Sequence, residues 1–350
     1  MTSYTLFSDS SMLDNLVHNR MNFKWYPTKN IKVVTELRNR FFVGDQVRKN
    51  PIYDQLLKTS NDHFDWTYTI EDKGNYIFFF MIDRAYGQYT RDKLEVKMGR
   101  QRINWGISAA WNPNDIFNAF SYFNFDYEER PGSDALSVKY YTGIASSVEV
   151  AAKLANDLYG FTGAALWKFN KYGYDFQLLS GVTKQNMVIG GGWAGNISKA
   201  GFKGETSYFA PMENAVDKTE VLVASLSLDY SFKNSLYLNG SALYNSNGST
   251  SPSFLDQILY YKGNISAKNL SPYRWSAFLQ GSYQFHPLVT GGMAVIGYPG
   301  SKNIFLGPYA GISILQNLDL DFFAQIMFSE IHHTYQAATQ AYFVRFKYSF

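Results

Sequence analysis

The chain has 350 residues, no cysteine and a net charge of +3, and 46% of its residues are hydrophobic. Its longest apolar run covers only residues 76–82, whereas a membrane helix needs about 20 apolar residues, so a helical membrane protein is excluded. The apolar content excludes a disordered chain, and the lack of cysteine excludes disulfide scaffolds and cysteine chemistry. The positive charge is spread along the chain, which argues against nucleic-acid binding.

Apolar and polar residues alternate along most of the chain, beginning with two segments that flank a turn at residues 27–30. Side chains alternate across a strand, so each such segment has one apolar face and one polar face. The same alternation recurs at residues 94–98, 147–154, 235–244, 274–285 and 318–329. We therefore predict an all-β chain whose strands have two different faces.

Short and long connections alternate between these segments. Tight turns are expected at residues 27–30, 90–92, 142–145, 170–173, 232–235, 286–288 and 316–317. Longer connections are expected at residues 45–75, 106–133, 155–160, 211–219, 246–272, 298–303 and 330–340. Transmembrane barrels have short periplasmic turns and long extracellular loops, whereas a Greek-key sandwich has no reason to sort its connections in this way. Residues 1–350 are therefore predicted to form one domain, a transmembrane antiparallel up-and-down β-barrel.

The strand count suggests an incomplete first strand. Seventeen segments can be counted back from the C-terminus to about Leu13, but bacterial barrels have an even number of strands. Residues 1–7 read as the second half of one more strand, which brings the count to about 18 and should pair with the last strand. No signal peptide is recognisable at the start, so we expect the first strand to be truncated and the export signal to lie upstream.

The end of the chain alternates aromatic and polar residues and finishes on Tyr348 and Phe350. A final strand of this kind resembles the signal that outer-membrane barrels present to the barrel assembly machinery. The alternative is an ordinary amphipathic last strand.

A barrel of about 18 strands encloses a water-filled lumen, which the polar faces should line. In the first long hairpin, the polar face carries Arg20, Lys24, Glu36, Arg38 and Arg40, so Arg20 should lie close to Arg38 and Arg40. A basic wall of this kind favours anionic solutes. The alternative, equally open, is that Glu36 and other acids neutralise the arginines.

Arg100 and Arg102 would face lipid if the alternation continued from Leu94, and a charge in the hydrocarbon is costly. We favour a bulge at Gly99 that turns both arginines inward over a position above the membrane.

The connection over residues 106–133 is long enough that it should have structure of its own. We expect it to fold into the lumen as a constriction, with surface decoration as the alternative. Asn112 followed by Pro113 predicts a short helix from Pro113 to Ala119. The candidate constriction residues are Trp111, Asn112, Asp115, Glu128, Glu129 and Arg130.

Two motifs in this region carry a family resemblance. Residues 99–106, Gly-Arg-Gln-Arg-Ile-Asn-Trp-Gly, and 112–115, Asn-Pro-Asn-Asp, resemble a signature of porin-like outer-membrane barrels in the style of alginate-export and substrate-specific porins. His18-Asn-Arg20 and Tyr26-Pro27 are most similar to barrels of the Bacteroidota. The resemblance covers about residues 13–145 and implies an outer-membrane barrel of 18 strands through which solutes or polymers pass.

The five histidines lack metal-ligand spacing, and the sequence has no G-x-S-x-G elbow. We therefore expect no enzyme, no metal and no cofactor. The predicted function is a passive channel of the bacterial outer membrane for small or polymeric polar solutes, with anions included. Its expected partners are outer-membrane lipid, the barrel assembly machinery, and a polar solute or polysaccharide. The alternative is a surface-binding or structural barrel with a plugged lumen.

Overall fold

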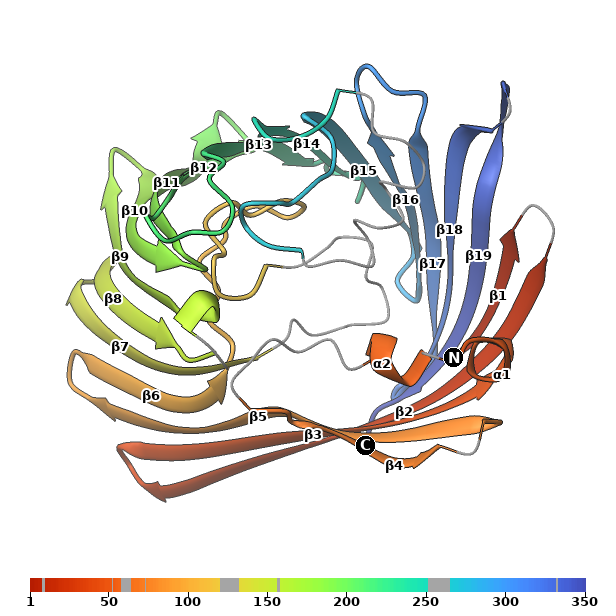
Figure 1. Ribbon diagram of the computed structural model, residues 1–350, viewed down its shortest axis with the longest axis horizontal. Coiled ribbons are helices and arrows are strands. Elements are labelled where there is room, and N and C mark those ends of the chain that lie inside the picture. Colours follow the sequence, from red (N-terminus) through yellow and green to blue (C-terminus); the bar gives the residue numbers. More distant parts are fainter. Residues whose placement is uncertain are drawn as a thin grey trace.

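The computed structural model describes residues 1–350 except 8–9, 52, 58–63, 73, 120–131, 156–157, 251–264 and 332. Its strands form one antiparallel sheet that closes into a ring (Figure 1). The ring closes at β1 (Thr2–Phe7), which pairs with both β2 (Ser11–Thr28) and β19 (Thr334–Tyr348). The predicted pairing of the first segment with the last strand is therefore confirmed.

Within the described residues, nineteen strands form the sheet, and eighteen of them make the ring, as the sequence predicted. The additional strand, β4 (Thr67–Asp72), pairs with the first part of β5, whereas β6 pairs with its second part. The remaining strands follow one another around the ring: β3 (Ile31–Gly44), β5 (Tyr76–Arg91), β6 (Leu94–Gln101), β7 (Ser133–Gly143), β8 (Ser146–Lys153), β9 (Thr162–Lys171), β10 (Tyr174–Thr183), β11 (Asn186–Ile197), β12 (Ala200–Pro211), β13 (Val221–Ser231), β14 (Tyr237–Asn245), β15 (Trp275–His286), β16 (Val289–Gly297), β17 (Ile304–Leu315) and β18 (Leu318–Ile331).

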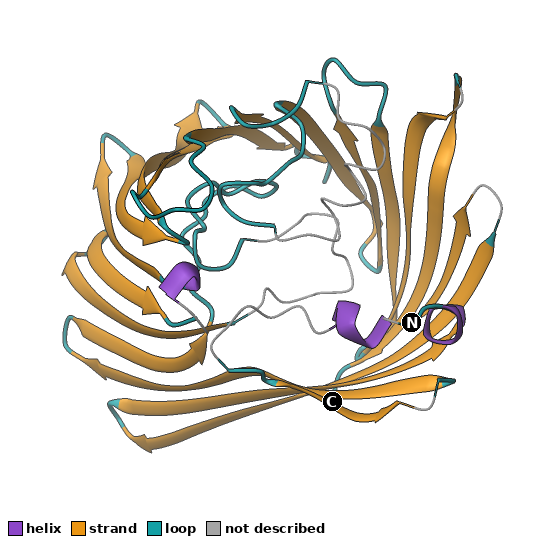
Figure 2. Ribbon diagram, viewed as in Figure 1, coloured by secondary structure: helices purple, strands orange, loops and turns teal. Residues whose placement is uncertain are grey.

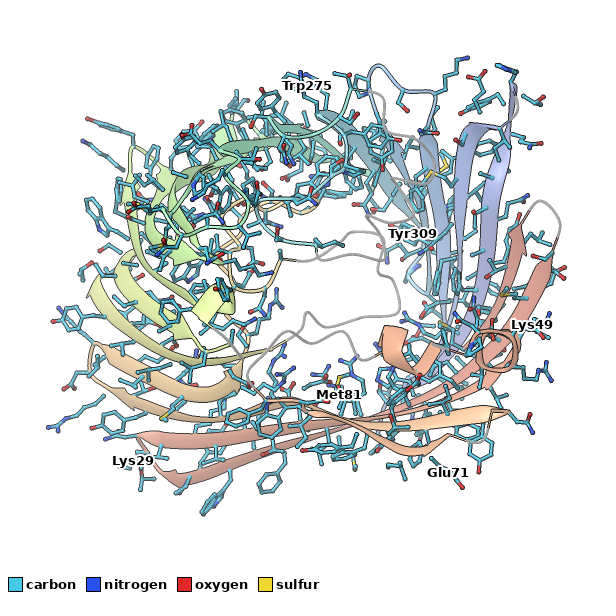
Figure 3. The ribbon with its side chains drawn as sticks, viewed as in Figure 1. Lys29, Lys49, Glu71, Met81, Trp275 and Tyr309 are labelled. Atoms are coloured by element: carbon cyan, nitrogen blue, oxygen red, sulfur yellow. The ribbon has the colours of Figure 1, made fainter. Side chains whose placement is uncertain are left out.

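Apolar side chains cover the outside of the ring. In β13, Leu222, Leu226 and Leu228 are exposed, while Val223 and the serines between them are buried. Figure 3 shows Trp275 on the outside of the ring and Met81 on the inside. Lipid cannot satisfy polar groups, so an apolar outer belt on a closed sheet is the arrangement of a transmembrane barrel.

The two rims of the barrel differ. At one rim, tight turns join the strands, and several turn residues, among them Asp92, Tyr172 and Ser235, have the positive φ that such turns need. The opposite rim carries the longer links, with the short helices α1 (Asp45–Lys49), α2 (Tyr53–Leu57) and η1 (Leu158–Gly160). Among the described residues, no helix is long and apolar enough to cross a membrane.

One predicted long connection, residues 330–340, is wrong. β18 continues to Ile331 and β19 begins at Thr334, with Glu330 paired to Tyr335. This stretch is polar, which made it look like a loop. Backbone pairing nevertheless continues there, because a ladder of hydrogen bonds needs no apolar side chains.

The inner face is not polar throughout, unlike the sequence prediction. From β9 to β17, the half of each strand nearest the longer links carries buried apolar side chains, including Leu166, Phe209, Val223, Leu243 and Ile296. Parts of the links at residues 103–119 and 265–273 pack on this band. The lumen therefore contains an apolar core on one side.

A second, smaller apolar cluster lies across the ring from the first. It joins Leu16, Phe42 and Phe79 to Val47 of α1, and Tyr53 of α2 packs edge-on against Phe42 with ring centroids 5.9 Å apart. Figure 2 shows α2 inside the ring. The first long link therefore also turns inward.

Candidate functional site

The segment over residues 102–119 lies inside the ring of strands, where Figure 1 draws it in gold. Ile103 and Trp105 are buried in the inner apolar core, while Arg102 and Asn104, which alternate with them, are exposed. Trp105 packs against Phe117 with ring centroids 4.8 Å apart. The segment therefore runs in extended form along the wall and turns alternate side chains toward the open part of the lumen.

One carboxylate of the wall holds the middle of this segment. Glu205 of β12 is 1% exposed, and its Oε1 accepts hydrogen bonds from the backbone N–H groups of Ile107 and Ser108, the latter at 2.8 Å. Its Oε2 accepts from the backbone N–H of Asn114 at 3.1 Å. Buried backbone donors need partners, and here the Glu205 side chain is the acceptor at both ends of residues 107–114.

The side chain of Asn114 fits into the adjoining part of the wall. Its Nδ2 donates to the carbonyl of Gly191 at 2.9 Å, and its Oδ1 accepts from the hydroxyl of Ser207 at 2.7 Å. A Cβ at Gly190 or Gly192 would lie 2.7 or 3.2 Å from this amide. The glycines on the inner face of β11 therefore leave the space that Asn114 occupies.

The predicted helix from Pro113 to Ala119 is absent from the described segment 102–119. Asn112 to Asp115 instead form a turn, in which the N–H of Asp115 donates to the carbonyl of Asn112 at 3.1 Å. The N–H of Asn114 bonds to Glu205 of the wall, and the described residues after this turn do not continue into a helix.

The structure describes three of the six candidate constriction residues. Trp111, Asn112 and Asp115 are buried, and Trp111 packs on Phe278 of β15 at 6.2 Å between ring centroids. These residues are placed to anchor the segment to the wall. The other three, Glu128, Glu129 and Arg130, lie outside the described residues.

Across the ring from this segment, β2 and β3 carry the arginines that the sequence singled out. Arg20 and Arg38 are direct cross-strand partners. Arg20 forms an ion pair with Glu36 at 2.5 Å, and the Nε of Arg38 donates to Asp83 at 2.7 Å. Acids therefore compensate part of the positive charge, as the alternative interpretation held.

The remaining two of the predicted pore-lining residues of β2 and β3 differ in exposure. Arg40 is buried at 6% exposure with its guanidinium 4.8 Å from the ring centroid of Phe42. Lys24 is exposed near the tight-turn end of β2.

A bulge in β5 adds residues that the sequence analysis missed. Glu36 pairs with Arg84 and Leu37 pairs with Ile82, so Asp83 is the extra residue and both Asp83 and Arg84 are buried. A bulge re-aims side chains in this way. The signal in the sequence was the adjacent pair of charges that ends the apolar run of this strand.

The predicted bulge at Gly99 is wrong. β6 pairs with β5 and β7 residue for residue. Gly99 does have φ +116°, and a Cβ there would lie 2.3 Å from the carbonyl oxygen of Ala85, so glycine is required for close approach of the strands. Arg100 is buried, with its Nη1 3.5 Å from Asp134, and Arg102 follows β6 in the exposed position described above.

Asp134 also ties the link before β4 to this cluster. Its Oδ1 accepts from the indole N–H of Trp66 at 2.9 Å, and its Oδ2 accepts from the backbone N–H of Phe64 at 3.0 Å. The sequence offered no signal for this contact, because the groups are far apart along the chain.

Comparisons with known proteins bear on the fold. No protein-family model matches the chain, and no curated protein matches it. Solved structures do: OccK5 (OpdH) of Pseudomonas aeruginosa has a TM-score of 0.62 at 8% identity, covering 100% of this chain and 96% of that one. OccAB3 of Acinetobacter baumannii has 0.61 at 9%, covering 100% and 97%. OccAB4 of the same organism has 0.57 at 9%, covering 98% and 95%.

The chain has the fold of the Occ and Opd porins. At these identities the likeness concerns the fold. The place of the protein in the outer membrane and the finer resemblance to alginate-export barrels and to Bacteroidota proteins stay predictions.

On this porin fold, the arginine cluster is the most distinctive chemical feature. Its described members lie at middle height on the wall from β2 to β7. They are the arginines Arg20, Arg38, Arg40, Arg84 and Arg100 and the carboxylates Glu36, Asp83 and Asp134. The described residues hold no group of three or more His, Cys, Asp or Glu that could bind a metal ion.

Proposed function

We propose that the protein is a passive channel of the bacterial outer membrane for small polar solutes, with a preference for anions. The observation that carries the proposal is the arginine cluster at middle height of a closed barrel, across from a segment folded into the ring. Passive passage needs a wet lumen, a narrow point and a field, and no nucleophile or cofactor. An enzyme reaction is not part of the proposal.

Arg40 and Arg102 are the members best suited to act on a passing ion. Arg102 is exposed on the segment, and Arg40 lies over the face of an aromatic ring. The selectivity role proposed here is assigned to Arg40 and Arg102, with Lys24 as a weaker contributor.

The test is the reversal potential of single channels in planar bilayers under a salt gradient. Wild-type protein should conduct with anion preference, and Arg40→Gln combined with Arg102→Gln should shift the reversal potential toward cations. The matched control removes two charges from the tight turns, Lys29→Gln with Lys233→Gln, and should leave the potential unchanged. An identical potential for wild type and the arginine double variant would overturn the proposed selectivity.

Passage of polymers is the extended form of the proposal. We propose that linear polysaccharides enter the same lumen, because a channel lined by arginine side chains can bind carboxylate-bearing sugars. Liposome swelling with neutral and uronate oligosaccharides of increasing length tests this. Equal swelling rates for the neutral and the uronate series would overturn the proposed passage of polysaccharides and would leave the proposed channel for small solutes.

The second candidate function is a surface-binding or structural barrel with a plugged lumen. The apolar core formed by residues 103–119 and 265–273 inside the ring favours it, since these links fill part of the lumen. In that case the links over residues 45–75 and 246–272 would hold the partner. Wild-type protein that inserts into bilayers and does not conduct would support this candidate.

For membrane insertion we propose that the end of β19 is read by the barrel assembly machinery. Tyr348 and Phe350 are exposed, with ring centroids 6.4 Å apart. Deletion of Phe350 with Tyr348→Ala should lower the amount of folded protein in outer membranes. The same change should leave refolding into detergent unaffected if the pair acts as a signal.

A further inference from the structure

We infer that Glu205 is the positioning residue that fixes the width of the pore, because it clamps residues 107–114 to the wall. This inference rests on the proposed channel function. The residue does not touch the open lumen in this role, since it is 1% exposed, and it acts through the backbone of the segment.

The first argument is the number of donors that depend on one group. The N–H groups of Ile107, Ser108 and Asn114 all bond to the Glu205 carboxylate. Hydrogen bonds to an ionised acceptor are stronger than neutral ones, and a buried donor left without a partner costs free energy. Removal of this carboxylate therefore leaves three backbone N–H groups of the docked segment without this acceptor, and each loss destabilises the docked position.

The second argument is independent and comes from the shape of the wall. The inner face of β11 has glycine at 190 and 192, where any Cβ would press on the side chain of Asn114. Ser207, the inward neighbour of Glu205 on β12, bonds the same amide. The space left by Gly190 and Gly192, together with the hydroxyl of Ser207, thus fits the side chain of Asn114. This fit indicates that the wall specifies where the segment docks.

Contacts at Trp105 and Trp111 hold the segment in a different way. Trp105 and Trp111 pack in the apolar core, and the carbonyl of Trp105 accepts from the amide of Gln177 at 2.9 Å. Without the carboxylate, these contacts should keep the segment attached while residues 106–110 and 112–114 leave the wall. The released chain would enter the lumen and change the calibre of the pore.

The test uses the absence of cysteine from the chain. Ser108 is 7% exposed, and Ser108→Cys keeps its backbone N–H, so the thiol reports release of the segment. In the otherwise unchanged protein a charged maleimide should label Cys slowly. With Glu205→Ala added, labelling should accelerate at least about tenfold, since one hydrogen bond to a charged group outweighs a factor of ten in an equilibrium. Single channels of Glu205→Ala should show an altered unit conductance.

The control is Asp229→Ala, which removes another carboxylate of the inner wall, one that pairs with Lys203 at 3.1 Å. It should change neither the labelling rate nor the unit conductance. Because Glu205→Ala could fail to fold, Gly190→Val provides a second route: its side chain should displace Asn114 and raise labelling in the same way.

The outcomes separate this inference from the proposed function. A wild-type protein that does not conduct would defeat the channel, while the labelling experiment would still measure the clamp. If wild type conducts, slow labelling in both Glu205→Ala and Gly190→Val would overturn the clamp. Fast labelling with unchanged unit conductance would overturn its role in setting the calibre, and an equal effect of Asp229→Ala would assign any change to lost charge.

Discussion

Replacing Asp83 by asparagine should strongly destabilise the barrel, because it leaves Arg38 charged and buried. The two side chains are 4% and 2% exposed and joined at 2.7 Å. Two unit charges about 4 Å apart attract by about 4 kcal/mol at an effective dielectric of 20, and breaking a buried pair by removing one partner costs about 3–5 kcal/mol. Water in the lumen weakens the interaction, so we expect Asp83→Asn to lower the free energy of unfolding by about 3 kcal/mol.

The assay is a urea titration of protein refolded into phospholipid vesicles, followed by tryptophan fluorescence. Asp92→Asn is the control, since Asp92 is an exposed turn residue whose φ of 51° asparagine tolerates, and the change should stay within about 0.5 kcal/mol. Arg38→Met together with Asp83→Leu should recover most of the loss, because no charge is then left unpaired. A loss below about 1 kcal/mol for Asp83→Asn would show that the pair is solvated, and the argument from burial would fail.

Two further predictions concern the outer belt and the long links. Leu226→Arg, in the middle of the outer face of β13, should lower the free energy of unfolding in vesicles by about 2–4 kcal/mol, and Leu222→Arg near the rim by less; equal losses would contradict a membrane centred on Leu226. In the link after β12, a hydrogen bond from Lys268 lowers the pKa of Asp217 to about 2. A lowered pKa means that the contact is complete above pH 4 and is lost as the pH falls toward 2. Pepsin cleavage near residue 217, normalised to an unfolded substrate, should rise over this range in wild type and be high throughout in Asp217→Asn; a flat wild-type profile would refute the contact.

The ring of strands could be predicted because its signals are local and repeated. Alternation with period two marks each strand, and the sorting of short and long connections marks the two rims. Even the short first strand was predictable, since an odd count of strands demanded a partner for β19. The stretch at residues 330–340 was misread because polar residues at a rim are common to loops and to strands that extend past the lipid.

The interior of the barrel could not be predicted in the same way. Glu205 lies 98 residues from Ile107, and in the sequence it looks like any other acid on a polar strand face. Which wall a long link will contact depends on side chains from several strands at once, such as Leu166, Leu243 and Phe278. Alternation gives the direction of each of these residues, and it does not reveal that a link covers them.

The arginine wall was predictable in part. The alternation placed Arg20 beside Arg38, and their register is as expected. The bulge in β5 and the acids Asp83 and Asp134 were missed, because a single extra residue reverses the phase of a strand without changing its composition. The bulge was assigned to Gly99 because the two arginines after it needed a way inward, whereas the positive φ of that glycine serves a close approach to β5.

The way in which Glu205 holds its segment has a consequence for how such channels can diverge. The carboxylate accepts hydrogen bonds from main-chain N–H groups, which every amino acid except proline carries. Side chains at positions 107 to 109 can therefore drift through evolution while the docked path persists. A lineage could retune its permeability by substitutions in the link and keep one unchanged acid in the wall, and an engineer could vary the same positions to build a library of nanopores on a constant scaffold.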